Sequence, residues 1–157
     1  KEAWRKENPF PFTPSVAEIN ALDAGLDRYL GEGPEAVWAR HATTAAAMRA
    51  GVVAMGLELW AARPAIASPT CTAVKLPAGV DETALRTLMK RRYGVVISSG
   101  RAETFNRLVR IGYMGPTAHP LYAVVALTAL GGAMAELTGR AIDIGAGVAA
   151  AEAVIRG

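Results

Sequence analysis

The sequence predicts an α+β domain, in which a small and mostly antiparallel sheet is covered by helices. At 157 residues, the chain is long enough to bury one hydrophobic core. Segments with apolar residues three and four positions apart alternate with short apolar runs, which indicates both helices and strands. The expected order is helix, helix, strand, helix, strand, strand, helix, helix. This order favours an α+β domain over a doubly wound parallel sheet.

The chain is expected to begin with an extended arm and two helices. Residues 8–14 contain three prolines, which remove backbone donors and hold the chain away from helix. Apolar residues then recur at helical spacing over 16–30, and this amphipathic helix ends at the glycines of 31–33. Pro34 suits the first turn of a second, longer helix that continues to about residue 55.

The rest of the chain predicts a sheet with three further helices. Strands are expected at 71–76, 95–98 and 108–111, and helices at 81–93, 120–137 and 144–155. Asp81 is a favoured N-cap residue, and Gly94 is a favoured residue just past a helix end. The last two helices are dense in Ala and Gly, which indicates close helix packing. No strand precedes these glycines, so they are not a dinucleotide-binding motif.

Composition excludes several functional classes. The net charge is +3, and the basic cluster 90–92 ends a helix with an acidic first turn, as the helix dipole favours, so we expect no nucleic-acid partner. The uncharged run 121–135 is shorter than the roughly 20 residues that span a bilayer, so we expect a buried helix and no membrane. A single cysteine, Cys71, fits a reducing, cytoplasmic compartment. We expect no signal peptide and no metal site, and we interpret the chain as a fragment because it lacks a starting Met.

The most informative segment is Leu108-Val109-Arg110-Ile111-Gly112, which places an arginine inside a short apolar strand that ends in glycine. A guanidinium group offers a planar fork of donors that matches a carboxylate in two parallel hydrogen bonds. Two interpretations of this motif by itself stay open. Arg110 binds a carboxylate ligand, or it pairs with a nearby Asp or Glu or faces solvent.

Several segments taken together resemble a known family. They are Phe12-Thr13-Pro14-Ser15-Val16, Glu18-Ile19-Asn20, Ala67-Ser68-Pro69-Thr70, Tyr93-Gly94-Val95-Val96, Ser99-Gly100-Arg101 and Arg110-Ile111-Gly112-Tyr113-Met114-Gly115. Over essentially the whole chain, this set resembles the C-terminal part of class V, fold-type I pyridoxal-phosphate aminotransferases. The resemblance implies that residues 34–157 form the C-terminal small domain of such an enzyme, preceded by an arm and connecting helix at 1–33.

The resemblance also implies roles for particular residues. Arg110 binds the carboxylate of the amino or keto acid, and Arg101 is similar to a second arginine near the same anion. For Arg101, a solvated turn residue paired with Glu103 stays an equal alternative. Thr13 matches a position that reaches the cofactor of the other subunit, and an N-cap role beside Pro14-Ser15 stays open. Phe10 stands where some glyoxylate-using relatives carry Tyr, which favours a B6 substrate without phosphate.

The two histidines are expected to have structural roles, and no lysine of this chain matches the catalytic lysine. His41 is expected on a helix surface or interface, and His119 is expected to cap a helix before Pro120. Transamination needs a lysine that forms a Schiff base with the cofactor. In the family this lysine belongs to the large domain, and none of this chain's lysines (Lys1, Lys6, Lys75 and Lys90) matches it. We therefore expect no catalytic residue in this chain.

Three functions stay in view. The first is a C-terminal fragment, inactive by itself, of an aminotransferase that moves an amino group from pyridoxamine to pyruvate. Its cofactor would be pyridoxal phosphate, or pyridoxal would bind as substrate and product. Its partners would be small amines, keto acids, its own large domain, and further copies in a homodimer or homotetramer. The second is an alanine- or serine-glyoxylate aminotransferase with bound pyridoxal phosphate. The third is a non-catalytic α+β module that binds a carboxylate, against which the apolar arm 4–14 counts because it suits burial on a partner.

Overall fold

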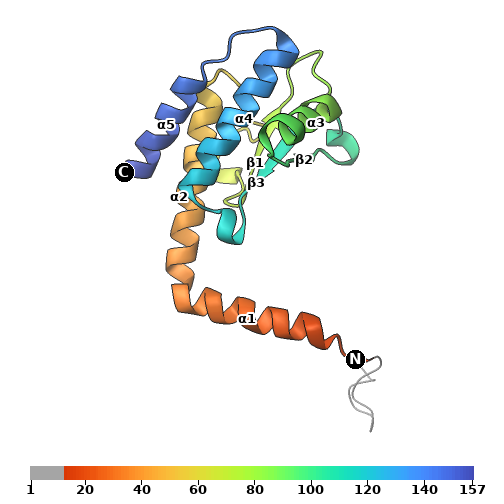
Figure 1. The fold of residues 1–157 in the computed structure, drawn as a ribbon. Coiled ribbons are helices and arrows are strands. Elements are labelled where there is room, and N and C mark those ends of the chain that lie inside the picture. The colour runs from red at the N-terminus through yellow and green to blue at the C-terminus, as the bar shows by residue number, and fades with distance from the viewer. Residues whose placement is uncertain (1–12) are drawn as a thin grey trace. The chain divides into compact units, whose positions relative to one another are not determined.

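The structure is a computed structural model that describes residues 13–157, so Phe10 and most of the predicted arm lie outside the described residues. The elements, shown in Figure 1, are α1 Val16–Glu32, α2 Pro34–Ala54, β1 Cys71–Lys75, α3 Glu82–Tyr93, β2 Ser98–Ser99, β3 Leu108–Gly112, α4 Pro120–Thr138 and α5 Ile144–Arg156. The predicted order of elements and the α+β class are confirmed. The chain divides into two compact units between Val37 and Trp38, and each unit is described by itself.

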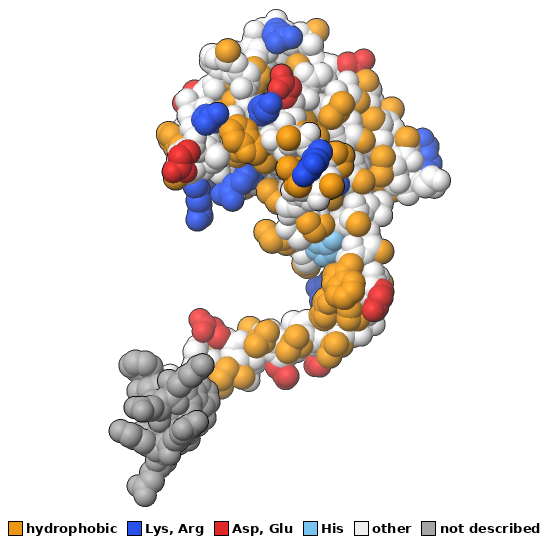
Figure 2. Space-filling model, turned by 180° about the vertical axis from the view of Figure 1, so that it is seen from behind, with side chains coloured by type: hydrophobic (Ala, Val, Ile, Leu, Met, Phe, Trp, Pro, Cys, Tyr) orange, Lys and Arg blue, Asp and Glu red, His pale blue; other side chains and the backbone are white. Residues whose placement is uncertain are grey.

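The first unit contains α1, whose apolar side chains are exposed. The helix predicted from the apolar spacing is confirmed, and the Gly33 N–H closes it by donating to the Tyr29 carbonyl at 3.1 Å. No residue of α1 is buried among the described residues, and Val16, Leu22 and Leu30 are each more than 60% exposed. Figure 2 shows these apolar side chains following one another along the helix.

The second unit contains a three-stranded antiparallel sheet with the strand order β1-β3-β2. In the central strand, Arg110 is the register partner of Ala73 on one side and Ser98 on the other. The residues before β1 extend the sheet at its edge, because Leu59 forms a bridge with Val74. The three strands were expected from alternating short apolar runs, and β1 and β3 lie where the sequence predicts them.

The strand predicted over 95–98 is wrong in its bounds, since β2 contains only Ser98 and Ser99. The physical reason lies in the end of α3. The Val95 N–H donates to the Met89 carbonyl at 3.2 Å, and the Ile97 carbonyl accepts a hydrogen bond from Arg86. These backbone groups serve the helix terminus and a side chain, so pairing with β3 begins only at Ser98.

One face of the sheet packs against helices to form the core. Val74 and Val109 are register partners and are both fully buried. Leu85 and Met89 of α3 and Leu130 of α4 are also fully buried in this core. Burial of apolar area contributes about 25 cal/mol per Å², so this shared core is the main stabilising term for the second unit. The strands that carry Arg110 are therefore held on a rigid support.

Helix α4 is long and apolar enough to cross a membrane by length and composition alone. Leu127, Leu130 and Met134 are nevertheless fully buried in the protein core. The prediction of a buried helix is confirmed, and α4 is a core helix of this fold.

The predicted helix caps are present. The Asp81 Oδ1 accepts a hydrogen bond from the Ala84 N–H at 2.8 Å, and Gly94 adopts the left-handed conformation that ends α3. The His119 Nδ1 accepts from the Leu121 N–H at 3.2 Å, which confirms its capping role. His41 was expected on a helix surface or at an interface, and the surface position is wrong, while the interface position stays a prediction. Its side chain is 9% exposed, and its Nε2 accepts from the Gly115 N–H at 3.2 Å.

Candidate functional site: two arginines beside the sheet

Arg110 is fixed in the middle of the central strand. Its Nε donates to the Ser99 carbonyl of the neighbouring strand at 2.8 Å, and its side chain is half-buried. Among residues 13–157, no Asp or Glu side chain forms an ion pair with Arg110. The described residues thus do not support the interpretation in which Arg110 pairs with a nearby carboxylate. With Nε engaged, the two terminal nitrogens of the guanidinium remain as donors for an external anion.

A hollow of about 440 Å³ lies beside Arg110. Trp60 and Ile66 form part of its apolar wall, and Arg49 and Cys71 also line it. Burial raises the pKa of the Cys71 thiol, and the nearby positive charge of Arg110 acts in the opposite direction. The combination of cationic groups and an apolar wall suits a small organic anion, because the charge binds the anionic end and the wall accepts the rest.

The end of β3 is tied to β1 by a buried pair of hydroxyl groups. The Tyr113 hydroxyl and the Thr72 Oγ1 lie 2.8 Å apart, and both side chains are about 2% exposed. Burial raises the pKa of Tyr113, while the hydrogen bond with Thr72 acts in the opposite direction. This contact helps to fix the register that places Arg110 opposite Ala73.

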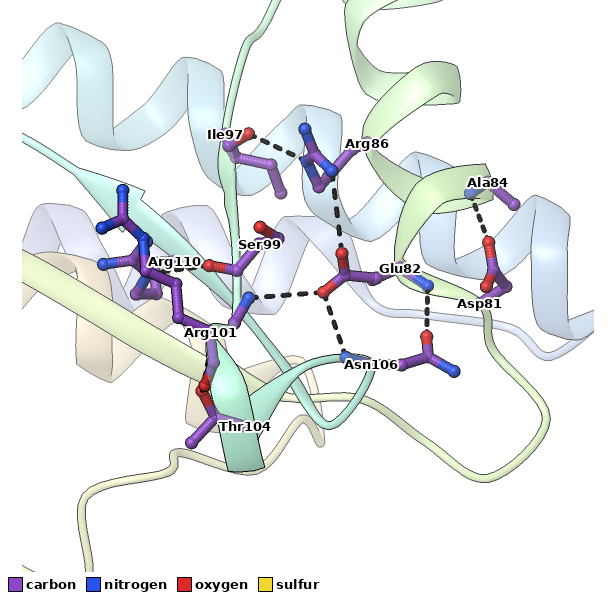
Figure 3. A network of polar contacts seen from close by, with 11 residues as sticks. Asp81, Glu82, Ala84, Arg86, Ile97, Ser99, Arg101, Thr104, Asn106 and Arg110 are labelled. Carbon is purple, nitrogen blue, oxygen red and sulfur yellow. Dashed lines mark hydrogen bonds and ion pairs between the residues drawn. The ribbon is translucent and has the colours of Figure 1, made fainter.

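Arg101 lies in the turn between β2 and β3. Its N–H donates to the Thr104 Oγ1 at 2.8 Å, and the Thr104 hydroxyl donates to the Arg101 carbonyl at 2.7 Å. The side chain is exposed, and the described part of the chain contains no ion pair between Arg101 and Glu103. In Figure 3, the side chains of Arg101 and Arg110 extend toward the same side of the network. Arg110 lines the hollow and Arg101 lies in the turn that precedes its strand, outside the lining of the hollow, so a shared binding role for the two arginines stays a prediction.

The remaining sequence-predicted site residue, Thr13, belongs to the other compact unit, where it is exposed ahead of α1. Its role near a cofactor stays a prediction. Sequence reasoning did not find Arg49 or Trp60, because both are distant from Arg110 in the sequence: Trp60 is held beside Ala73, the register partner of Arg110, and Arg49 lies in α2. It also assigned Glu82 only to the helix dipole, whereas the structure buries this side chain against the turn that contains Arg101.

The described lysines do not fit covalent attachment of an aldehyde cofactor. Lys75 Nζ lies 2.9 Å from Glu58 Oε2, and Lys90 is exposed on α3. Neither lines the hollow beside Arg110. A Schiff base needs a lysine that is free to attack a carbonyl group next to the bound substrate. The chemistry that these residues can perform is therefore recognition of an anion.

Comparison with known proteins shows which family this chain resembles. No family model matches the chain. The pyridoxamine-pyruvate transaminase of Mesorhizobium japonicum is 66% identical over 155 residues, which are 99% of this chain and 39% of that protein. The L-aspartate-glyoxylate aminotransferase of Paracoccus denitrificans is 37% identical over 92% of this chain and 36% of its own length.

A solved structure agrees with these relatives. The crystal structure of the pyridoxamine-pyruvate aminotransferase from Mesorhizobium loti matches with a TM-score of 0.93 at 66% identity, over 99% of this chain and 40% of that chain. This chain thus spans about two fifths of the length of the proteins it matches. Over essentially its whole length, the chain belongs to the aminotransferase family.

Proposed function

We propose that this chain forms the carboxylate-binding part of an aminotransferase that transfers an amino group from pyridoxamine to pyruvate, giving pyridoxal and alanine. The observation that carries the proposal is Arg110, whose Nε is fixed at 2.8 Å from the Ser99 carbonyl while no carboxylate of the described residues pairs with it. The 66% identity to a pyridoxamine-pyruvate transaminase supports the choice of substrates.

The arrangement suits pyruvate in size and polarity. The terminal nitrogens of Arg110 would donate to the two carboxylate oxygens, which is the geometry that arginine offers and lysine does not. Arg101 would add a second positive charge near the same anion. The small methyl group of pyruvate suits the apolar lining that Trp60 and Ile66 provide.

The other parts of the activity belong to the complete enzyme. We infer that it uses pyridoxal phosphate, or pyridoxal as a substrate and product, that residues outside this chain supply the lysine, and that Thr13 contributes to binding the B6 group of a neighbouring subunit. When bound, the B6 group supplies the electron sink that transamination requires. A large domain on the same chain, a homodimer or homotetramer in which Thr13 approaches the neighbouring cofactor, and a cytoplasmic location are parts of this proposal.

The test is Arg110→Lys in the complete enzyme. The substitution removes the planar fork, and a hydrogen bond to a charged group contributes about 1.5–3 kcal/mol, so the KM for pyruvate should rise about 10- to 150-fold. Arg92→Lys is the matched control, because Arg92 pairs on the surface with Glu136 at 2.7 Å. A pyruvate KM that stays at the parent value in Arg110→Lys would refute the assignment.

Two further measurements separate the alternatives. Arg101→Ala should raise the pyruvate KM less than Arg110→Lys does, and a larger effect would mean that the two roles are reversed. A kcat/KM for glyoxylate that exceeds the value for pyruvate would favour an alanine- or serine-glyoxylate aminotransferase instead.

A further inference from the structure

We propose that Glu82 is a positioning residue for substrate binding, which acts on Arg110 through the peptide group between Ser99 and Gly100. This inference rests on the proposed function, because it assumes that Arg110 binds the substrate carboxylate. Glu82 stands in the first turn of α3 and is 1% exposed, although charged side chains are rarely buried without a specific partner.

One peptide group connects the two side chains. Its carbonyl oxygen, on Ser99, accepts the hydrogen bond from Arg110 Nε at 2.8 Å. Its N–H, on Gly100, lies 3.3 Å from Glu82 Oε2 and also donates to the Leu108 carbonyl at 3.2 Å. A trans peptide directs its N–H and its carbonyl to opposite sides, so Glu82 and Arg110 hold the same rigid plane from its two edges (Figure 3).

The same carboxylate closes the turn that follows. Glu82 Oε2 also accepts from the Asn106 N–H at 3.2 Å, and the Glu82 N–H donates to the Asn106 Oδ1 at 2.9 Å. Gly100 and Asn106 are the two ends of the turn that contains Arg101. Glu82 therefore holds both ends of this turn at one point (Figure 3).

The turn has a backbone that needs such an anchor. Ala102 and Asn106 have φ angles of 47° and 53°, in the left-handed region that residues other than glycine seldom adopt. A Cβ atom at Gly100 would collide with the backbone carbonyl of Thr104. The turn is thus compact and conformationally disfavoured, and contacts from outside it are required to keep this geometry.

The negative charge of Glu82 matters as well as its shape. Its ion-pair partner is Arg86, whose Nη1 lies 3.7 Å from Oε1, while the Arg86 Nε donates to the Ile97 carbonyl just before β2. Hydrogen bonds from backbone N–H groups to an ionised carboxylate are roughly twice as strong as those to a neutral acceptor. A glutamine would occupy the same space but hold the peptide more weakly, and this difference makes the inference testable.

The experiment measures pyruvate kinetics in the complete enzyme with Glu82→Gln. We expect the pyruvate KM to rise about fivefold, since the weaker acceptor lets the Ser99-Gly100 peptide and Arg110 leave their aligned positions, with kcat within about twofold of the parent. Asp81→Ala is the matched control. It removes the N-cap bond to Ala84 on the same helix turn, and among the described residues the Asp81 side chain has no hydrogen bond or ion pair with the turn of Arg101, so its KM should be unchanged while its thermal stability falls.

A double-mutant cycle distinguishes positioning from general destabilisation. Arg110→Lys removes the Nε–H that donates to the Ser99 carbonyl. If Glu82 acts through that bond, adding Glu82→Gln to Arg110→Lys should raise the KM by less than a further factor of about two. Fully multiplicative effects, or an unchanged KM in Glu82→Gln, would overturn the positioning role. An unchanged KM in Arg110→Lys would instead overturn the proposed function.

A second variant keeps the test decisive if Glu82→Gln folds poorly. Asn106→Gly retains a residue that tolerates the positive φ and removes only the Oδ1 that accepts from Glu82. It should raise the pyruvate KM in the same direction by a smaller factor. A parent-like KM in this variant would count against the anchor.

Discussion

Replacing Gly51 with alanine tests whether the close approach of α2, α4 and α5 supports the second unit. Gly51 is buried in α2, where an added Cβ would overlap the Leu127 side chain and lie 2.8 Å from the Gly147 carbonyl oxygen. Leu127 is fully buried, and the Gly147 oxygen belongs to the backbone of α5. Neither group can move aside without separating the helices, because the core is close-packed.

Two opposing effects set the magnitude. Alanine is better than glycine in a helix interior by about 1 kcal/mol. Adding a methyl group to a well-packed core costs about 1–3 kcal/mol, and the upper part of this range applies when the obstacle is backbone rather than a flexible side chain. The free energy of unfolding should therefore fall by about 1–2 kcal/mol, which lowers Tm by about 4–8 °C for a unit of this size.

The assay is urea unfolding, with the midpoints compared at equal m values. Gly132→Ala is the matched control, because it carries the same gain in helix propensity but meets only the phenol end of Tyr93, a side chain that is 36% exposed and can rotate outward. We expect this control to lie within about 1 kcal/mol of the parent. A Gly51→Ala protein as stable as the parent would refute the close-packing argument.

Two further predictions concern the buried hydroxyl pair and the lysines. Tyr113→Phe should lower the free energy of unfolding by about 1–3 kcal/mol, because it leaves the Thr72 hydroxyl buried without its partner at 2.8 Å. Adding Thr72→Val should recover part of this loss. A free energy of unfolding equal to that of the parent in Tyr113→Phe, measured by urea denaturation, would contradict this prediction. The chain by itself, mixed with pyridoxal or pyridoxal phosphate and an amino acid, should show no turnover, and borohydride trapping with peptide mapping should find no single preferred lysine. A specific adduct on Lys75 or Lys90 together with transaminase activity would show that this chain carries its own catalytic lysine.

Most helices could be predicted because the residues that begin and end them act through local hydrogen bonds and backbone conformation. Asp81 caps α3 through its own side chain, and Gly94 ends that helix with a positive φ of 68°. Such features depend only on neighbours within a few residues. The strand at 95–98 failed for the opposite reason. Its apolar residues favour a strand, but the Val95 N–H is already used by the end of α3.

The candidate site could be predicted only where one residue carried the information. An arginine within an apolar strand is unusual enough to point to an anion, so Arg110 was accessible from sequence. The rest of the hollow was not, because Trp60 reaches Arg110 through a chain of pairings: the Trp60 N–H donates to the Ala73 carbonyl at 2.9 Å, and Ala73 is the register partner of Arg110. Register depends on the whole sheet and its core, which local spacing does not specify.

Glu82 shows a different kind of limit. Acidic residues in the first turn of a helix are favoured by the helix dipole whether or not they contact anything else, so Asp81 and Glu82 look alike in the sequence. Successive helix residues point about 100° apart, and here Asp81 caps the helix at the surface while Glu82 faces the sheet and is 1% exposed. The positive end of α3 also offsets part of the cost of burying the carboxylate, so one helix terminus both supports the charge and aims it at the peptide that holds Arg110.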